Sequence, residues 1–225
     1  MTDIVINVKP VVLSDGQAKA LDFFRRDKSS VDGELSYDDR AMTPGRPDEF
    51  NRTDVGVIRR GMGLDRIRTT VWDWLVEDAD VSVLEALPRN VHLADVSEDE
   101  YPAIREGIEA TLREFVGDGE YRGLTVASKA VHLKRPMLMP ICDSYAVAVL
   151  KIPLKADASK AERVAAGLEA SDMIWQAVKD NRAELDVICA LLDERAFPRT
   201  PVRVLDALLW LKFGGNIRPG RPRPA

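Results

Sequence analysis

The sequence predicts an all-α fold, a single mostly helical domain with one short strand at its start. Apolar residues recur at helical spacing in several segments, and residues typical of helix N-caps open these segments. The only convincing strand candidate is "DIVINV", residues 3–8. With 225 residues, of which 45% are hydrophobic and 31% charged, the chain is long enough to bury a substantial core.

The expected helices follow one another with little other structure between them. They cover residues 14–28, 52–63, 65–78, 101–117, 127–136, 144–150, 159–179 and 200–215. Three starts have clear cap signatures, namely Ser97 with Glu100, Ser159 with Glu162, and Thr200 before Pro201. The helix at 52–63 is expected to begin at Thr53 or Asp54. The polar stretch 29–49 contains glycine and proline and is predicted to be a long loop.

We expect one domain over residues 1–217 and a disordered, basic, proline-rich tail over 218–225. No apolar run approaches the roughly 20 residues of a membrane span, and the N-terminus lacks the pattern of a signal peptide. Cys142 and Cys189 are far apart and indicate neither a disulfide framework nor a zinc or iron–sulfur site. These features predict a cytoplasmic monomer without a cofactor or a metal.

Charge is segregated along the chain, whose formal net charge is −5. Residues 121–142 contain four basic residues and no acid, and residues 52–68 contain five arginines against two aspartates. This pattern predicts an anion-binding face on an acidic body. The alternative, that these charges are solvated helix faces, stays open.

The stretch "ASKAVHLKRPMLMPICDSYAV", residues 127–147, places a cationic helix before a single carboxylate, Asp143. With the helix at 101–117 and the glycine-containing connector "DGEYRGLTV", it gives a helix, a hairpin and a helix over about 104–136, then Pro140 and Asp143. This order resembles the helix-hairpin-helix DNA glycosylase superfamily over about residues 50–150. The chain departs from that pattern at Thr125, where a second hairpin glycine is expected, and by one extra residue between Pro140 and Asp143.

The resemblance implies a helix-hairpin-helix glycosylase-like fold and an enzyme that hydrolyses the N-glycosidic bond of a flipped, modified base, leaving an abasic site. Asp143 would stabilise positive charge on the sugar and orient a water molecule, or it would only cap the helix that follows. The hairpin has no lysine, and the nearest one, Lys129, lies inside the following helix. A monofunctional enzyme is therefore expected. The alternatives are a non-catalytic DNA-binding module with a regulatory or defence role, and a scaffold protein.

Double-stranded DNA is the expected partner. Residues expected to contact its backbone are Arg59, Arg60, Arg122, Gly123, Thr125, Lys129, Lys134 and Arg135. Weaker candidates for the base pocket or for a wedge in the duplex are Met62, Leu64, Trp72 and Tyr145. His132 and Trp210 are expected to be structural and core residues, respectively.

The identity of the excised base is predicted from the resemblance and from two features of the sequence. Some glycosylases resembling this superfamily remove glucosylated hydroxymethylcytosine from phage DNA. The absence of iron–sulfur cysteines and the long 29–49 stretch favour such a specialised, anti-phage role. Residues 36–40 would then supply hydrogen-bonding groups to a wide pocket, and a plain structural loop is the alternative.

Overall fold

The computed structural model describes residues 4–9, 11–26, 37–42, 48–64, 66–118, 122–195 and 198–214. In these residues the chain is mostly helical and has one small sheet, so the predicted all-α class is confirmed. Buried apolar side chains from Ile6 to Leu209 form one cluster that joins the elements. The tail predicted over 218–225 lies outside the described residues.

The elements have the following bounds. Two strands, β1 (Ile6–Val8) and β2 (Val11–Leu13), precede the helices α1 (Gly16–Arg26), α2 (Tyr37–Met42), α3 (Arg52–Gly61) and α4 (Thr69–Glu77). Two 3-10 helices follow, η2 (Val81–Ala86) and η3 (Leu93–Asp95). The remaining helices are α5 (Tyr101–Phe115), α6 (Leu124–Lys134), α7 (Ser144–Val149), α8 (Lys160–Asp180), α9 (Arg182–Asp193) and α10 (Pro201–Gly214).

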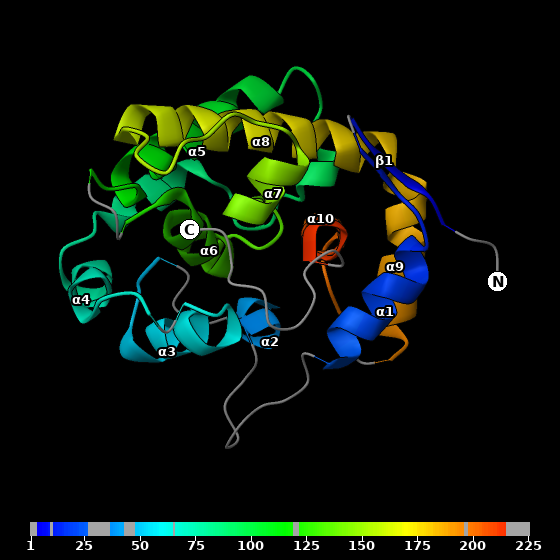
Figure 1. Cartoon of the computed structure of the whole chain (residues 1–225), viewed down its shortest axis with the longest axis horizontal. Helices are drawn as coiled ribbons and strands as arrows, with labels where there is room; N and C mark the ends of the chain where they lie inside the picture. Colours follow the sequence, from blue (N-terminus) through cyan, green and yellow to red (C-terminus); the bar gives the residue numbers. More distant parts are fainter. Residues whose placement is uncertain are drawn as a thin grey trace.

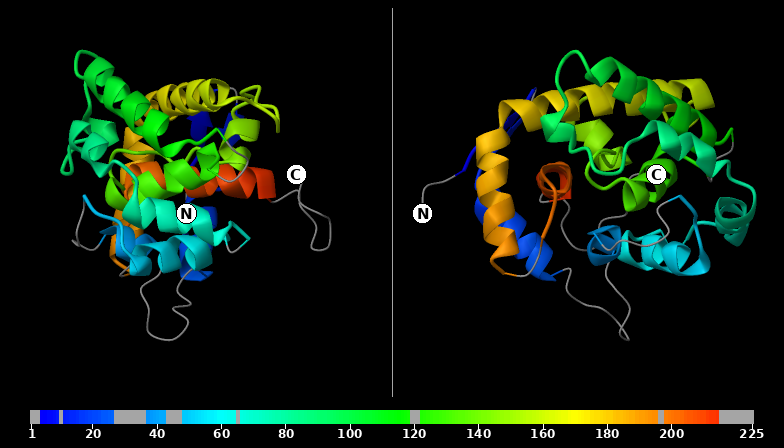
Figure 2. Two further views of the ribbon diagram at one scale, coloured as in Figure 1. Left: turned by 90° about the vertical axis from the view of Figure 1, so that its left-hand side faces the viewer. Right: turned by 180° about the vertical axis from the view of Figure 1, so that it is seen from behind.

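The long helices frame the molecule. α5 and α8 pack side by side along one side, and α9 turns away from the end of α8 and packs beside α1 (Figure 1). α2 and α3 lie on the opposite side from α5 and α8 (Figure 1). Between these two sides runs α10, which contacts α7, α8 and α9 (Figure 2). Residues on α10 are therefore positioned to join the two halves of the fold.

α10 is buried along most of its length. Residues 201–209 are all buried, although two of them, Arg203 and Asp206, are charged. Thr200 caps the helix as predicted, since its hydroxyl accepts a hydrogen bond from the backbone N–H of Arg203 at 3.1 Å. The prediction that Trp210 is a core residue is wrong. Its side chain is 39% exposed because α10 leaves the core at this point.

Some of the helices begin at residues that cap them through their side chains. Ser159 and Glu162 form the predicted reciprocal capping box of α8. Ser97 and Glu100 exchange the same two hydrogen bonds in the turn before α5, but the N-cap residue of α5 is Glu100 and not the predicted Ser97. The cap of α3 is Asn51, which accepts a hydrogen bond from the backbone N–H of Asp54 at 3.0 Å. The prediction that Thr53 or Asp54 caps this helix is therefore wrong.

The predicted N-terminal strand is confirmed as β1, and it has a partner that the sequence pattern did not indicate. β1 pairs antiparallel with β2, with Ile6 opposite Leu13. Asn181, between α8 and α9, binds the outer side of this ribbon: its side chain accepts from the N–H of Asn7 at 2.8 Å and donates to the carbonyl of Asn7 at 2.7 Å. The ribbon is thus attached to the junction of two long helices.

The long loop predicted over 29–49 is wrong where the structure describes it as helix, in α2. Tyr37 is buried and its hydroxyl donates to the backbone carbonyl of Lys129 at 2.7 Å. A Cβ atom added at Gly61 would lie 2.7 Å from the Cβ of Tyr37, so α2 and α3 approach closely. α2 is therefore held by distant contacts, which a local pattern does not reveal.

Cys142 and Cys189 are both free thiols. Among the helices described, none combines the length and the apolar character that crossing a membrane requires. In the same residues no group of three or more histidine, cysteine or acidic side chains could hold a metal ion.

Candidate functional site

Lys129 of α6 and Asp143, which precedes α7, form a buried ion pair. Lys129 Nζ lies 3.4 Å from Asp143 Oδ2, and the two side chains are 8% and 5% exposed. The other carboxylate oxygen, Oδ1, accepts hydrogen bonds from the backbone N–H groups of Tyr145 and Ala146, both at 3.0 Å. Asp143 is therefore the N-cap of α7, which fixes the carboxylate while Oδ2 faces the lysine. Of the two roles left open by the sequence, capping is confirmed, and it does not prevent a chemical role.

His132 holds the connector between α6 and α7 in place. Its Nδ1 lies 2.6 Å from the carbonyl oxygen of Met139. Burial, together with the positive charge of Arg203, lowers the pKa of His132 to about 4. The imidazole is therefore neutral near pH 7 and donates its Nδ1 proton to that carbonyl. Its Nε2 atom is buried and has no hydrogen-bond partner among the described residues. This arrangement agrees with the structural role predicted for His132.

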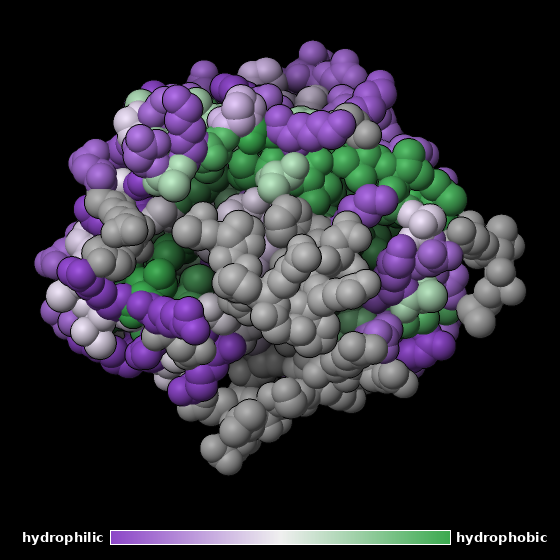
Figure 3. Space-filling view, viewed as in Figure 1, coloured by the Kyte–Doolittle hydropathy of each residue, from purple (hydrophilic) through white to green (hydrophobic). Residues whose placement is uncertain are grey.

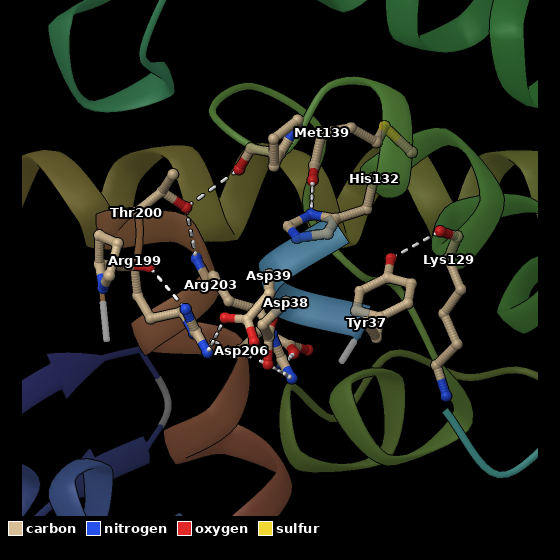
Figure 4. A network of polar contacts seen from close by, with 12 residues as sticks. Tyr37, Asp38, Asp39, Lys129, His132, Met139, Arg199, Thr200, Arg203 and Asp206 are labelled. Atoms are coloured by element: carbon tan, nitrogen blue, oxygen red, sulfur yellow. Dashed lines mark hydrogen bonds and ion pairs between the residues drawn. The ribbon is translucent and has the colours of Figure 1, made fainter. Parts of the chain in front are cut away.

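A network of charged side chains joins α2 to α10 (Figure 4). Arg203 donates to both oxygens of Asp38, at 2.6 Å and 3.1 Å, and it also donates to Asp206 one turn further along α10. A second arginine, Arg199, lies 3.8 Å from Asp38 and donates to Asp39 at 3.3 Å. The bidentate contact between Arg203 and Asp38 fixes both the position and the orientation of the two side chains.

Asp206 connects the network electrostatically to Lys129 and Asp143. Burial raises the pKa of Asp206 to about 7, and the negative charges of Asp143 and Asp38 act in the same direction. The positive charges of Arg203 and Lys129 act in the opposite direction. A carboxyl group with such a pKa exchanges its proton near neutral pH, which is the property that general acid–base chemistry requires.

Sequence reasoning missed the roles of Asp38, Arg203 and Asp206. Asp38 is predicted to line a polar pocket in a loop, and it is 1% exposed and bound to Arg203 instead. The other two lie in "VRVLDALLWL", whose pattern is that of a core helix. A signal was present, because charged residues three apart within an apolar helix need buried partners.

The exposed basic face predicted for α6 is wrong. Lys134 is buried, and its Nζ donates to Asp54 Oδ2 at 2.7 Å. Arg40 donates to the other oxygen of the same carboxylate at 2.9 Å. Lys134 therefore serves to join α6 to α3, because its charge is matched inside the protein.

Arg135 is also internal, and its side chain is 1% exposed. It donates to the backbone carbonyl oxygens of Leu84 and Leu87, at 2.8 Å and 2.6 Å, and to Asp48 at 2.6 Å. Burial lowers the pKa of Arg135 to about 10. Neither Lys134 nor Arg135 can reach a DNA phosphate from these positions, and Lys129 faces Asp143 rather than solvent.

Another group of basic residues, arginines around the turn between α3 and α4, does reach the surface. Arg60, Arg66 and Arg68 are exposed, and Arg59 is half-buried. Figure 3 shows hydrophilic residues gathered at the lower-left edge of the molecule, where α3 lies. Arg122, from the connector before α6, stacks on the ring of Trp74 in α4 at 4.2 Å from the ring centroid. We call these five arginines the α3–α4 arginine group.

The N-terminus of α6 leaves space for a phosphate group to approach its backbone N–H groups. Gly123 is the N-cap, and no side chain caps the helix. A Cβ atom added at Gly123 would meet nothing within 4 Å. Thr125, in the first turn, is half-buried. Backbone N–H groups and the helix dipole favour an anion at such a helix start.

The predicted pocket and wedge residues are not all available. Trp72 is 1% exposed and its indole N–H donates to the carbonyl of Ile67 at 3.3 Å, so its predicted role against a flipped base is wrong. Met62 and Leu64 are half-buried and pack against the core. Tyr145 is half-buried, and its ring lies 6.2 Å from that of Trp210.

The sequence pattern of the protein family DUF6308, described as a family of unknown function, matches residues 71–212. The match covers more than half of the chain, so the chain belongs to this family. It includes Lys129, Asp143, Arg203 and Asp206, but not α1, α2 or α3. No curated protein and no solved structure matches the chain significantly.

Proposed function

We propose that this member of the family is a DNA glycosylase whose chemical centre is the pair formed by Lys129 and Asp143. One observation carries the proposal: Oδ1 of Asp143 is anchored to the start of α7, and Oδ2 faces a lysine in a largely buried site. The order α5, α6 and α7, with a proline-containing connector before Asp143, is also the order of helix-hairpin-helix glycosylases. The helix-hairpin-helix glycosylase-like fold is part of this proposal.

The chemistry needs a fixed negative charge. Cleavage of an N-glycosidic bond develops positive charge on the sugar, and a carboxylate beside that sugar stabilises the transition state. Asp143 is suited to this because the backbone N–H groups of Tyr145 and Ala146 hold it in one orientation before substrate arrives. Low exposure strengthens the electrostatic effect, since there is little water to screen it.

The position of Lys129 favours a second candidate function. The hairpin has no lysine, which predicts a monofunctional enzyme in which water attacks the sugar. Lys129 Nζ nevertheless lies 3.4 Å from Asp143 Oδ2, where Asp143 can accept a proton from the ammonium group. The resulting amine can attack C1′ as the base leaves, which forms a C–N bond and then an imine. In that case base removal is accompanied by strand cleavage at the abasic site.

DNA contact is assigned to only part of the set that the sequence pattern indicates. Arg59, Arg60, Arg122 and Gly123 are kept, and Arg66 and Arg68 are added. Lys129, Lys134 and Arg135 are left out because they are buried and paired. The α3–α4 arginine group and the open start of α6 at Gly123 supply exposed positive potential. Arginines of this kind bind phosphates without regard to sequence, and affinity then falls steeply with salt. The alternative of a DNA-binding module without catalysis uses the same surface and leaves the Lys129–Asp143 pair with a structural role only.

A panel of duplexes tests the proposal. Each duplex carries one base of a different class: uracil, an alkylated purine, 8-oxoguanine, hydroxymethylcytosine or glucosylated hydroxymethylcytosine. Abasic sites are scored by alkaline cleavage, and direct strand breaks are scored without alkali. Release of a base from one class supports the glycosylase, and release of the glucosylated base alone supports the defence role. Tight, salt-sensitive binding with no release of any base supports the non-catalytic module instead.

Borohydride separates the two mechanisms. If Lys129 forms an imine, reduction during turnover links the protein covalently to DNA, and the link is lost in Lys129→Gln. If water is the nucleophile, no covalent product forms and the abasic site stays intact until alkali is added.

A further inference from the structure

An exposed tryptophan lies one helical turn from the buried charged network. Trp210 is 39% exposed, whereas residues 201–209 before it on α10 are buried. Trp210 follows Asp206 by four positions, so both side chains lie on the same face of α10. The ring of Trp210 therefore lies at the outer end of this face of α10. Asp206 lies at the inner end of the same face, and its pKa depends on the charges of Lys129 and Asp143.

Two other rings meet Trp210 edge to face. The ring of Tyr145 lies 6.2 Å away at an interplanar angle of 76°, and the ring of Phe23 lies 5.8 Å away at 62°. Both are half-buried. Edge-to-face contacts of this kind hold a ring in position, and the 39% exposure of Trp210 leaves part of its ring open to a ligand. The three rings come from α1, α7 and α10 and form an aromatic group at the surface.

The aromatic group is physically continuous with the Lys129–Asp143 pair. The backbone N–H of Tyr145 donates to Oδ1 of Asp143 at 3.0 Å, so the position of Tyr145 and that of the carboxylate are fixed together. On the other side, the guanidinium of Arg203 lies 5.4 Å from the ring centroid of Phe23. The group is therefore connected on two sides to charged residues of the candidate site.

We propose that Phe23, Tyr145 and Trp210 form a stacking site for a planar heteroaromatic ring, a nucleobase in the case of a DNA substrate. The proposal rests on the proposed function for the identity of the ring, and on the geometry of the three side chains for its existence. Tryptophan gains affinity by stacking on any base, because every base offers a π-face. Phe23 lies outside the segment that matches the family, residues 71–212, so α1 contributes to a specificity that need not be common to the family.

Two substitutions test the site. Trp210→Ala removes the exposed ring, and Trp175→Phe is the matched control because Trp175 stacks on Tyr101 at 3.7 Å, away from the aromatic group. Binding is measured by fluorescence anisotropy with two duplexes that differ at one position, one carrying a mismatched base and the other a tetrahydrofuran abasic analogue. We expect Trp210→Ala to weaken binding of the mismatched duplex about ten-fold and to leave the abasic duplex unchanged.

A second measurement does not depend on DNA binding or on catalysis. Free nucleosides at millimolar concentration should quench part of the tryptophan fluorescence in the unmodified protein and in Trp175→Phe, and should quench less in Trp210→Phe. Quenching that is lost in Trp210→Phe, without release of any base from the duplex panel, supports the stacking site and overturns the glycosylase. Base release, together with Trp210→Ala binding both duplexes as tightly as the unmodified protein does and with equal quenching in all variants, overturns the stacking site and leaves the glycosylase standing.

Discussion

Two regions with similar basic character in the sequence behave in opposite ways in the structure. The stretch around α6 contributes Lys134 and Arg135, and both are buried and paired with Asp54 and Asp48. The turn between α3 and α4 contributes arginines that remain at the surface. A run of positive charge therefore does not by itself indicate an interface, because the basic residues can be buried in ion pairs with acidic residues that lie far away in the sequence.

The largest effect on the free energy of unfolding is expected at Lys134, in the buried stretch around α6. Lys134→Met removes the ammonium group that binds Asp54, whose side chain is 0% exposed, and leaves that carboxylate with Arg40. Breaking a buried pair by removing one partner should lower the free energy of unfolding by about 3 kcal/mol. Urea denaturation followed by circular dichroism measures it. A loss below about 0.5 kcal/mol, the usual limit for a surface substitution, would mean that Lys134 is solvated after all.

An intermediate and pH-dependent effect is expected at Asp206. Its pKa in the folded protein is raised to about 7, so the folded state keeps a proton that the unfolded chain has already lost. As pH rises from about 4 to 7, the unmodified protein should lose stability relative to Asp206→Asn, and the difference should become constant once pH is well above 7. Thermal unfolding of both proteins across this range checks the sign. An opposite trend would show that ionised Asp206 stabilises the fold through Arg203.

The smallest effect on stability is expected in the exposed region. Replacing Arg60 and Arg66 together by serine should change the free energy of unfolding by less than about 0.5 kcal/mol. The same double variant should weaken binding to every duplex and reduce the salt dependence by up to about two phosphate contacts. Anisotropy titrations at several salt concentrations provide the measurement. An unchanged slope would place the DNA contact elsewhere.

Local signals predict the α-helices other than α2 and α9, and contacts between distant residues decide how the helices pack. The capping box of Ser159 and Glu162 lies within four residues, so it can be predicted from the sequence. The partners Lys134 and Asp54 are 80 positions apart, and Arg203 and Asp38 are 165 apart. A local sequence pattern does not show which distant carboxylate will form an ion pair with a given arginine. The same reason explains why α2 was missed, since its burial depends on contacts with α6 and α10.

Of the two residues of the candidate pair, only Asp143 could be predicted from the sequence as a site residue beside the reacting sugar. Asp143 stood out because it follows a helix, a proline and an apolar connector. Its partner Lys129 was assigned to a DNA-binding face, because the sequence does not show that α6 turns this residue toward the start of α7. Asp206 and Trp210 were interpreted as parts of a core helix, since the point at which α10 leaves the core is set by the packing of the whole chain.

In the proposed function, Asp143 supplies a negative charge for chemistry in addition to capping α7. Asp143→Asn keeps an oxygen that can accept from the N–H groups of Tyr145 and Ala146, and it removes the charge that faces Lys129. Because that change leaves a buried ammonium group without its partner, a second protein combining Asp143→Asn with Lys129→Met serves as the stability-matched control.

The most direct measurement is single-turnover base release by these proteins, at a temperature where circular dichroism shows all of them folded. The unmodified protein should release the base, and Asp143→Asn should do so on the order of 100 to 1,000 times more slowly. The double variant should recover stability without recovering any activity. Base release at the unmodified rate by folded Asp143→Asn would contradict the account and would leave Asp143 as a helix cap.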